Sequence, residues 1–254
     1  MQRNAVCWVA IFLAGCVLSS AGCQLQGLRS VMHVSRDRPL SGRQVADVQL
    51  TLARSLEHRG EMEQAIDAYQ IAVEKDPKRA TGYWRMAILQ DRLGKIEESK
   101  AMYQAALKRD SKNPDLLCDY GYSLYLQRRW AESEQQLKQA IVLNPRHLRA
   151  HNHLGLVLAQ TEQSEAALAE FRKAGCDSAE ARSNLALVMT LNHRWDEARE
   201  QYELALDANP DSATAQSGLE NLEAVLAKTE PNAGTFRMTS LMRSADGKPE
   251  VFGK

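Results

Sequence analysis

The chain has 254 residues, with 32 Lys and Arg residues against 32 Asp and Glu residues, and a pI near 7.0. This neutral balance argues against a nucleic-acid partner, and a mean hydropathy of -0.43 argues against a protein with many membrane spans. A content of 44% hydrophobic and 25% charged residues is that of an ordinary globular chain, which excludes disorder throughout.

The N-terminus carries the pattern of an export signal, which we expect to occupy residues 1–23. An apolar run from Ala5 to Leu18 follows Arg3 and contains no charged side chain. The run closes twice on small residues before a cysteine, first at Cys16 and then at Cys23. Each closure resembles the lipobox of bacterial lipoproteins. The resemblance implies lipidation of Cys16 or Cys23 and a membrane-anchored protein on the periplasmic side of the bacterial envelope.

Two other interpretations fit the same apolar run. It also suits an ordinary secretory signal or an uncleaved membrane helix, and four arginines soon after the run weigh against export: Arg29, Arg36, Arg38 and Arg43. With an uncleaved helix the protein would be an adaptor on the cytoplasmic side. Residues 24–45 lack apolar periodicity and are expected to form a flexible tether.

A period of 34 residues organises the chain after the tether. The same spacings recur in two distant segments: Ala65-x3-Tyr69-x2-Ala72-x4-Pro77 and Ala198-x3-Tyr202-x2-Ala205-x4-Pro210. The period predicts a solenoid over residues 46–228, followed by a tail at 229–254 that is expected to be disordered. Its predicted units are five helix hairpins and a capping helix: 46–79, 80–113, 114–147, 148–178, 179–212 and 213–228.

Each unit pairs an apolar face on its first helix with a small and a bulky residue on its second. In the first unit, Leu52, Ala53 and Leu56 are expected to form that apolar face, against Ala65 and Tyr69. The pattern resembles the tetratricopeptide repeat over about two thirds of the chain. The resemblance implies an all-α, right-handed superhelical solenoid.

The tetratricopeptide family binds peptides or helices of partner proteins in a concave groove lined by the first helices. The repeat positions that the family uses imply a groove lined by Arg54, His58, Trp84, Arg85, Cys118, Asp119, Tyr122, Tyr125, Arg149, Asn152, His153, Ser183 and Asn184. Arginine and histidine in the first two repeats favour an acidic segment there. The alternative is a solvated face on which Tyr122 or Tyr125 packs against the neighbouring hairpin. The Lys and Asn pair of chaperone-tail-binding members is absent from every repeat.

The fourth repeat lacks three residues after its second helix, over the stretch from Phe171 to Ala181. Gly175 is expected to absorb the tighter turn. This stretch, with the lipobox, resembles the tetratricopeptide lipoprotein of the tight-adherence pilus assembly system. A generic shortened repeat is the alternative.

The sequence contains no recognisable catalytic, cofactor-binding or metal-binding motif. Trp130 and Trp195 share one repeat position and are expected to pack at the start of a second helix. His151 and His153 are two residues apart on a helix and cannot chelate one metal together. We therefore expect a protein-interaction scaffold, not an enzyme, that holds a component of a secretion or pilus assembly machine. An enzyme that uses unrecognised groove residues is the rival hypothesis.

Overall fold

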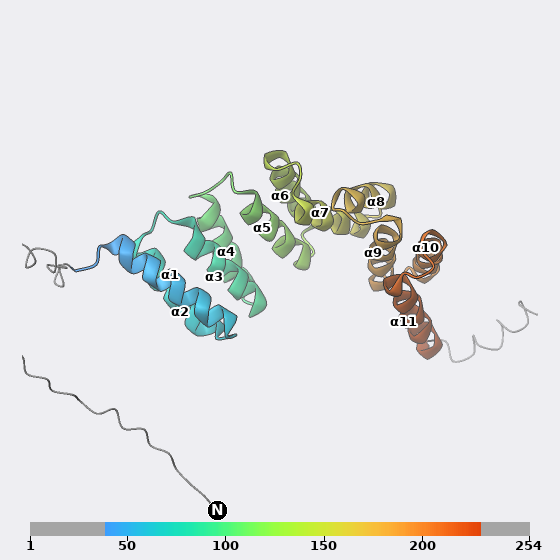
Figure 1. Cartoon of the computed structure of the whole chain (residues 1–254), viewed down its shortest axis with the longest axis horizontal. Coiled ribbons are helices and arrows are strands. Elements are labelled where there is room, and N and C mark those ends of the chain that lie inside the picture. The colour runs from blue at the N-terminus through green and yellow to red at the C-terminus, as the bar shows by residue number, and fades with distance from the viewer. Residues whose placement is uncertain (1–38, 230–254) are drawn as a thin grey trace, which may run out of the picture. The chain divides into compact units, whose positions relative to one another are not determined.

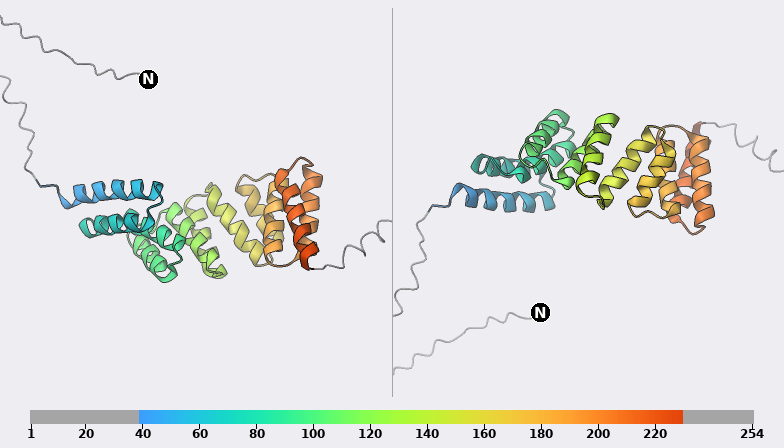
Figure 2. Two further views of the ribbon diagram at one scale, coloured as in Figure 1. Left: turned by 90° about the horizontal axis from the view of Figure 1, so that it is seen from below. Right: turned by 90° about the horizontal axis from the view of Figure 1, so that it is seen from above.

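The computed structural model describes residues 39–229 and holds eleven α-helices and no strand within that range (Figure 1). The helices are α1 Gly42–His58, α2 Met62–Lys75, α3 Ala80–Arg92, α4 Ile96–Leu107, α5 Pro114–Leu126, α6 Trp130–Leu143, α7 Leu148–Gln160, α8 Ser164–Lys173, α9 Ser178–Leu191, α10 Trp195–Ala208 and α11 Ala213–Thr229. Each odd-numbered helix from α1 to α9 forms a hairpin with the next helix, and α11 packs against α9 and α10 (Figure 2). The all-α solenoid of helix hairpins is therefore confirmed.

The helices all lie in one compact unit. The predicted export signal, the two lipobox cysteines Cys16 and Cys23, and the tail after Thr229 lie outside the described residues.

The first helix begins at Gly42, inside the stretch 24–45 that was expected to be a tether. Ser41 is its N-cap, because the Ser41 hydroxyl accepts the Gln44 backbone N–H at 3.3 Å. In return, the Gln44 side chain accepts the Ser41 backbone N–H at 2.9 Å, which completes a capping box. Two backbone donors are satisfied in this way, so residues 42–45 are helical and the prediction of a tether there was wrong.

Small and bulky residues pair inside every hairpin, as the repeat pattern predicted. The small residue and the bulky residue four positions later are both buried in each second helix: Ala65 and Tyr69, Ser99 and Tyr103, Ser133 and Leu137, Ala167 and Phe171, Ala198 and Tyr202. The facing first helix makes room for the bulky side chain. A Cβ atom on Gly155 of α7, for example, would lie 2.6 Å from the Phe171 ring of α8. Trp130 and Trp195 pack against the same core, as expected.

One predicted core residue is misplaced. Leu52 is 44% exposed, and Leu50 is buried with Ala53 and Leu56 instead. The residues equivalent to Leu52 in the next three repeats are buried: Met86, Tyr120 and Leu154. Each of those repeats follows another hairpin, which covers this position. No hairpin precedes α1 within residues 39–229, so nothing there buries Leu52, although the periodicity predicted it to be in the core.

In the turn of each hairpin, one residue has a positive φ in the left-handed region, and this residue is glycine in only two of the five hairpins. Gly60 and Gly94 have φ of 80° and 72°, and the equivalent Arg128, Glu162 and His193 have φ between 58° and 62°. A non-glycine residue in this region costs about 1–2 kcal/mol, so hairpin packing must hold these turns in place. Gly175 has a φ of 96° after the short helix α8, which confirms its predicted role in the tighter turn.

Candidate partner-binding groove

The first helices α1, α3, α5 and α7 are joined side by side through residues of the predicted binding strip. Arg85 on α3 forms an ion pair with Glu57 on α1. The Trp84 indole on α3 donates to Asp119 on α5 at 3.1 Å. Arg149 on α7 donates to the same Asp119 carboxylate at 3.0 Å. The structure therefore brings together strip residues from the second, third and fourth repeats, and Glu57, which was not in the predicted strip, links them to the first repeat.

Two hollows lie on this face, and together we call them the first-helix groove. The first hollow has a volume of about 450 Å³ and is lined by Arg54, Glu57, His58, Thr81, Trp84, Arg85 and Arg92. The second hollow has a volume of about 330 Å³ and is lined by Arg85, Ile88, Asp91, Arg92, Tyr103, Asp119, Tyr122, Leu126 and Arg149. Because Arg85 and Arg92 line both hollows, the two are adjacent.

The Asp119 carboxylate is the organising group of the second hollow. It accepts hydrogen bonds from Trp84 and Arg149, and Arg149 also donates to Asp115 at 3.1 Å. Burial raises the pKa of Asp119, and the Arg149 guanidinium and the Trp84 hydrogen bond act against that rise. These bonds hold the Trp84 and Arg149 side chains in place, so this part of the groove is ordered by contacts within the chain itself.

Cys118 and His153 lie in contact with each other, next to the exposed Tyr122 ring. The Cys118 Sγ and the His153 Nδ1 are 3.5 Å apart, and the Tyr122 ring stacks on the His153 ring with centroids 4.4 Å apart. Burial raises the pKa of Cys118 to about 12 and lowers the pKa of His153 to about 4, with the Arg149 charge contributing to the latter. The pair is therefore a neutral thiol and a neutral imidazole at pH 7, without the thiolate that a cysteine nucleophile requires.

The lowered pKa of His153 predicts a specific dependence of stability on pH. Below its ordinary pKa of 6.5 the unfolded chain binds a proton at this site, and the folded protein does so only near pH 4. Stability must therefore fall as the pH drops from 6.5 to about 4. We expect His153→Asn to flatten the fall of the thermal midpoint over that range, while Val142→Ala, which alters an exposed side chain that carries no titratable group, leaves it unchanged. A thermal midpoint that falls equally steeply with pH in the unmodified protein and in both variants would contradict the lowered pKa of His153.

Other residues of the predicted strip lie outside both hollows. Tyr125 packs against the Trp130 ring, with centroids 5.3 Å apart, as well as stacking on Tyr122. The Asn184 amide lies 3.7 Å from the Cys176 sulfur at the connection between α8 and α9. Asn152 and Ser183 also line neither hollow. The sequence offered packing of Tyr122 or Tyr125 against the neighbouring hairpin as an alternative. Tyr122 does stack on His153 of α7 but remains 37% exposed, whereas Tyr125 packs on Trp130 of its own hairpin.

The sequence reasoning missed several groove residues. Ile88, Asp91 and Arg92 lie one to two turns further along α3 than Arg85, and Leu126 lies one turn beyond Tyr122 on α5. Glu57 lies one turn beyond Arg54 on α1. A search for side chains at i+3, i+4 and i+7 from the strip residues would have found them, because these positions share a helix face.

The described residues carry no cluster that points to metal chemistry. Between residues 39 and 229, no three His, Cys, Asp or Glu side chains are placed to hold a metal ion. Over the same range, no helix combines the length and the apolar character that crossing a membrane requires.

Comparison with known proteins places the repeats in a family. Models of the tetratricopeptide repeat match residues 47–79, 85–142, 118–181 and 163–213. The type IV pilus assembly protein PilF of Pseudomonas aeruginosa is 29% identical over 167 residues, which cover 65% of this chain. The alignment spans 62% of the length of that relative.

Solved structures share the arrangement of helices. PilF of Pseudomonas aeruginosa matches with a TM-score of 0.55 at 22% identity, over 80% of this chain and 100% of that one. PilW, a widely conserved type IV pilus biogenesis factor, matches with a TM-score of 0.56 at 19% identity, over 74% and 95% of the two chains. YrrB, a repeat protein with an unusual peptide-binding site, matches with a TM-score of 0.53 at 25% identity, over 68% and 90%. The chain belongs to the tetratricopeptide repeat family.

Proposed function

We propose that the protein is an interaction scaffold of the bacterial envelope that holds a component of a pilus or secretion assembly machine in the first-helix groove. The sequence relationship to a type IV pilus assembly protein is the observation that carries this proposal. The ordered side chains of the groove support it, because they lower the entropy cost of binding a partner segment. A lipid on Cys16 or Cys23 would hold the scaffold at the membrane, on the periplasmic side.

The groove is tested by replacing side chains that line it while keeping the Arg85 and Glu57 ion pair. We expect Trp84→Ala with Tyr122→Ala to reduce the partner recovered from cross-linked cells by at least about ten-fold, because aromatic anchors dominate such interfaces. The matched control is Val142→Ala on the second helix α6, where the side chain is 78% exposed. Unchanged recovery by a double variant with a normal unfolding transition would remove the groove from the proposal.

The lipid anchor is tested separately by mass spectrometry of the mature N-terminus. An acylated Cys16 or Cys23 supports the envelope lipoprotein. An intact Met1 contradicts it and favours the adaptor held by an uncleaved helix.

A separate measurement tests the rival hypothesis that the protein is an enzyme. Turnover of a substrate by the purified protein, lost in the Trp84 and Tyr122 variant, would favour an enzyme. Stable co-purification of another envelope protein favours the scaffold.

A further inference from the structure

The two halves of the first-helix groove differ in charge, and this difference defines the partner segment. In the first hollow, Arg54 and Arg92 have no acidic partner among the described residues. Glu57 is the carboxylate that lines this hollow, and its side chain is only 8% exposed. It pairs with Arg85 and accepts the Tyr69 hydroxyl at 2.7 Å. The first hollow therefore offers two uncompensated guanidinium groups.

The second hollow differs from the first because it carries two carboxylates, Asp91 and Asp119, beside its guanidinium groups, and it also has an apolar surface. Asp119 pairs with Arg149, and Asp91 accepts a hydrogen bond from the Ser99 hydroxyl. Exposed carbon atoms remain on Ile88, Tyr122 and Leu126, of which Tyr122 is 37% exposed and Leu126 is 59% exposed. This hollow thus favours a bulky apolar side chain, because removing apolar surface from water is favourable.

The two hollows share Arg85 and Arg92, so one short segment can fill both. We propose, building on the scaffold function above, that the groove recognises an unstructured protein segment in which acidic residues lie within about three positions of a bulky apolar residue. The carboxylates bind between Arg54 and Arg92, and the apolar side chain lies against Tyr122 and Leu126. A nucleic acid would match the first hollow alone, because the second also presents the Asp91 and Asp119 carboxylates and exposed apolar carbon.

The test measures binding of four peptides to the full chain in detergent by fluorescence anisotropy, with a neutral fluorophore. All four have a Gly and Ser background. The probe carries Asp-Asp-Leu-Phe, and the others carry Asn-Asn-Leu-Phe, Lys-Lys-Leu-Phe or Asp-Asp-Ser-Ser in its place. We expect the probe to bind about ten-fold more tightly than the amide peptide, since its two carboxylates can form exposed ion pairs that the amides cannot. The preference should weaken as ionic strength rises.

Variants of groove residues test which hollow causes the preference for Asp over Asn and which causes the preference for Leu-Phe over Ser-Ser. We expect Arg54→Gln with Arg92→Gln to abolish the preference for Asp over Asn and to keep the preference for Leu-Phe over Ser-Ser. Leu126→Ser should do the reverse. Arg172→Gln, which alters an exposed arginine at the end of α8, is the matched control and should change neither preference.

Several results would overturn this assignment. Equal binding of the Asp and Asn peptides, an Asp preference that survives loss of both arginines, or no binding of any peptide at about 1 mM would each do so. Partner capture in cells that is lost with Trp84 and Tyr122 but kept without Arg54 and Arg92 would also overturn the motif, and it would leave the scaffold function standing.

Discussion

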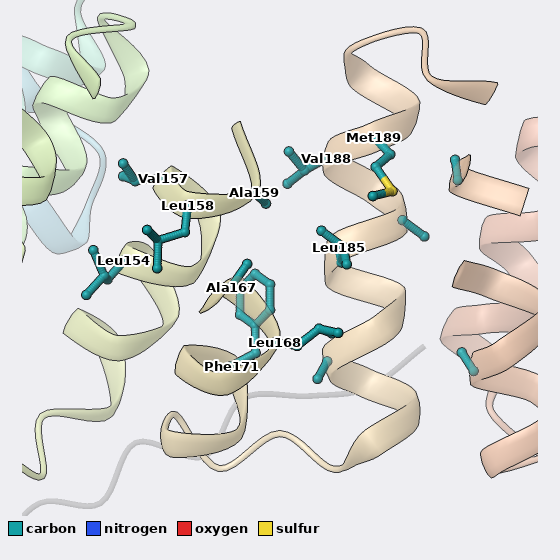
Figure 3. Close-up of a cluster of buried hydrophobic side chains, with 14 of the residues drawn as sticks. Leu154, Val157, Leu158, Ala159, Ala167, Leu168, Phe171, Leu185, Val188 and Met189 are labelled. Carbon is teal, nitrogen blue, oxygen red and sulfur yellow. The ribbon is translucent and has the colours of Figure 1, made fainter. Parts of the chain in front are cut away.

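Replacing Phe171 with Ala is expected to lower the free energy of unfolding by about 3–5 kcal/mol. Phe171 is fully buried on α8 and lies between α7 and α9, in the largest of the three core clusters (Figure 3). A hairpin of a solenoid buries its apolar faces only against its neighbours, so a cavity here weakens the array on both sides. Urea denaturation followed by circular dichroism measures the loss.

The contact between Phe171 and Gly155 makes this prediction sharper. Gly155→Ala alone should destabilise by about 1–3 kcal/mol, because its Cβ would lie 2.6 Å from the ring. In the Phe171→Ala background the same change should stabilise, since the Cβ enters the vacated space and Ala favours a helix over Gly by about 1 kcal/mol. Simple additivity of the two changes would show that the ring does not pack on Gly155. Val142→Ala is the exposed control, with an expected effect within about 0.5 kcal/mol.

Replacing Arg85 with Ala is expected to lower the free energy of unfolding by about 2 kcal/mol, although Arg85 lines the groove. Its loss leaves the Glu57 carboxylate, which is 8% exposed, without its cation. Removing one partner of a buried pair costs about 3–5 kcal/mol, and the one-third exposure of the Arg85 side chain reduces this value. Thermal unfolding of the purified variant measures the effect.

Rescue by a second substitution separates this structural role from binding. Glu57→Gln removes the charge and keeps an acceptor for the Tyr69 hydroxyl, whose pKa is raised to about 12 by burial and by Glu57. We expect Arg85→Ala with Glu57→Gln to recover most of the lost stability. The surface control is Arg172→Ala on α8. A loss for Arg85→Ala no larger than that control would contradict a structural role for the pair.

The fold was largely predictable because the same pair of a small and a bulky residue recurs in every repeat and packs in the same way. Ala167 and Phe171 occupy the positions of Ala65 and Tyr69, and such pairs are buried in all five hairpins. The errors lie at the start of the array. Leu52 is exposed because no hairpin precedes the first one within the described residues. The start of α1 was missed because it depends on the capping box of Ser41 and Gln44, which lies in a stretch without apolar periodicity.

The groove was predictable as a strip of positions but not as a set of interactions. Repeat positions place Trp84 and Asp119 on first helices, yet their hydrogen bond spans 35 residues and depends on how adjacent hairpins are oriented. The same holds for Arg85 and Glu57, which are 28 residues apart. Periodicity fixes the face on which a side chain lies, whereas its partner is set by the geometry between repeats. The charge difference between the two hollows emerges only when these pairs are known.

The most direct test of the scaffold function is site-specific photo-cross-linking in cells that carry the full chain. A photoreactive amino acid replaces Tyr122 in the groove or Val142 on the second helix α6, both of which have exposed side chains. We predict one discrete cross-linked envelope protein from position 122 and none from position 142. Equal cross-linking from both positions, or a partner attached only through position 142, would contradict binding in the first-helix groove.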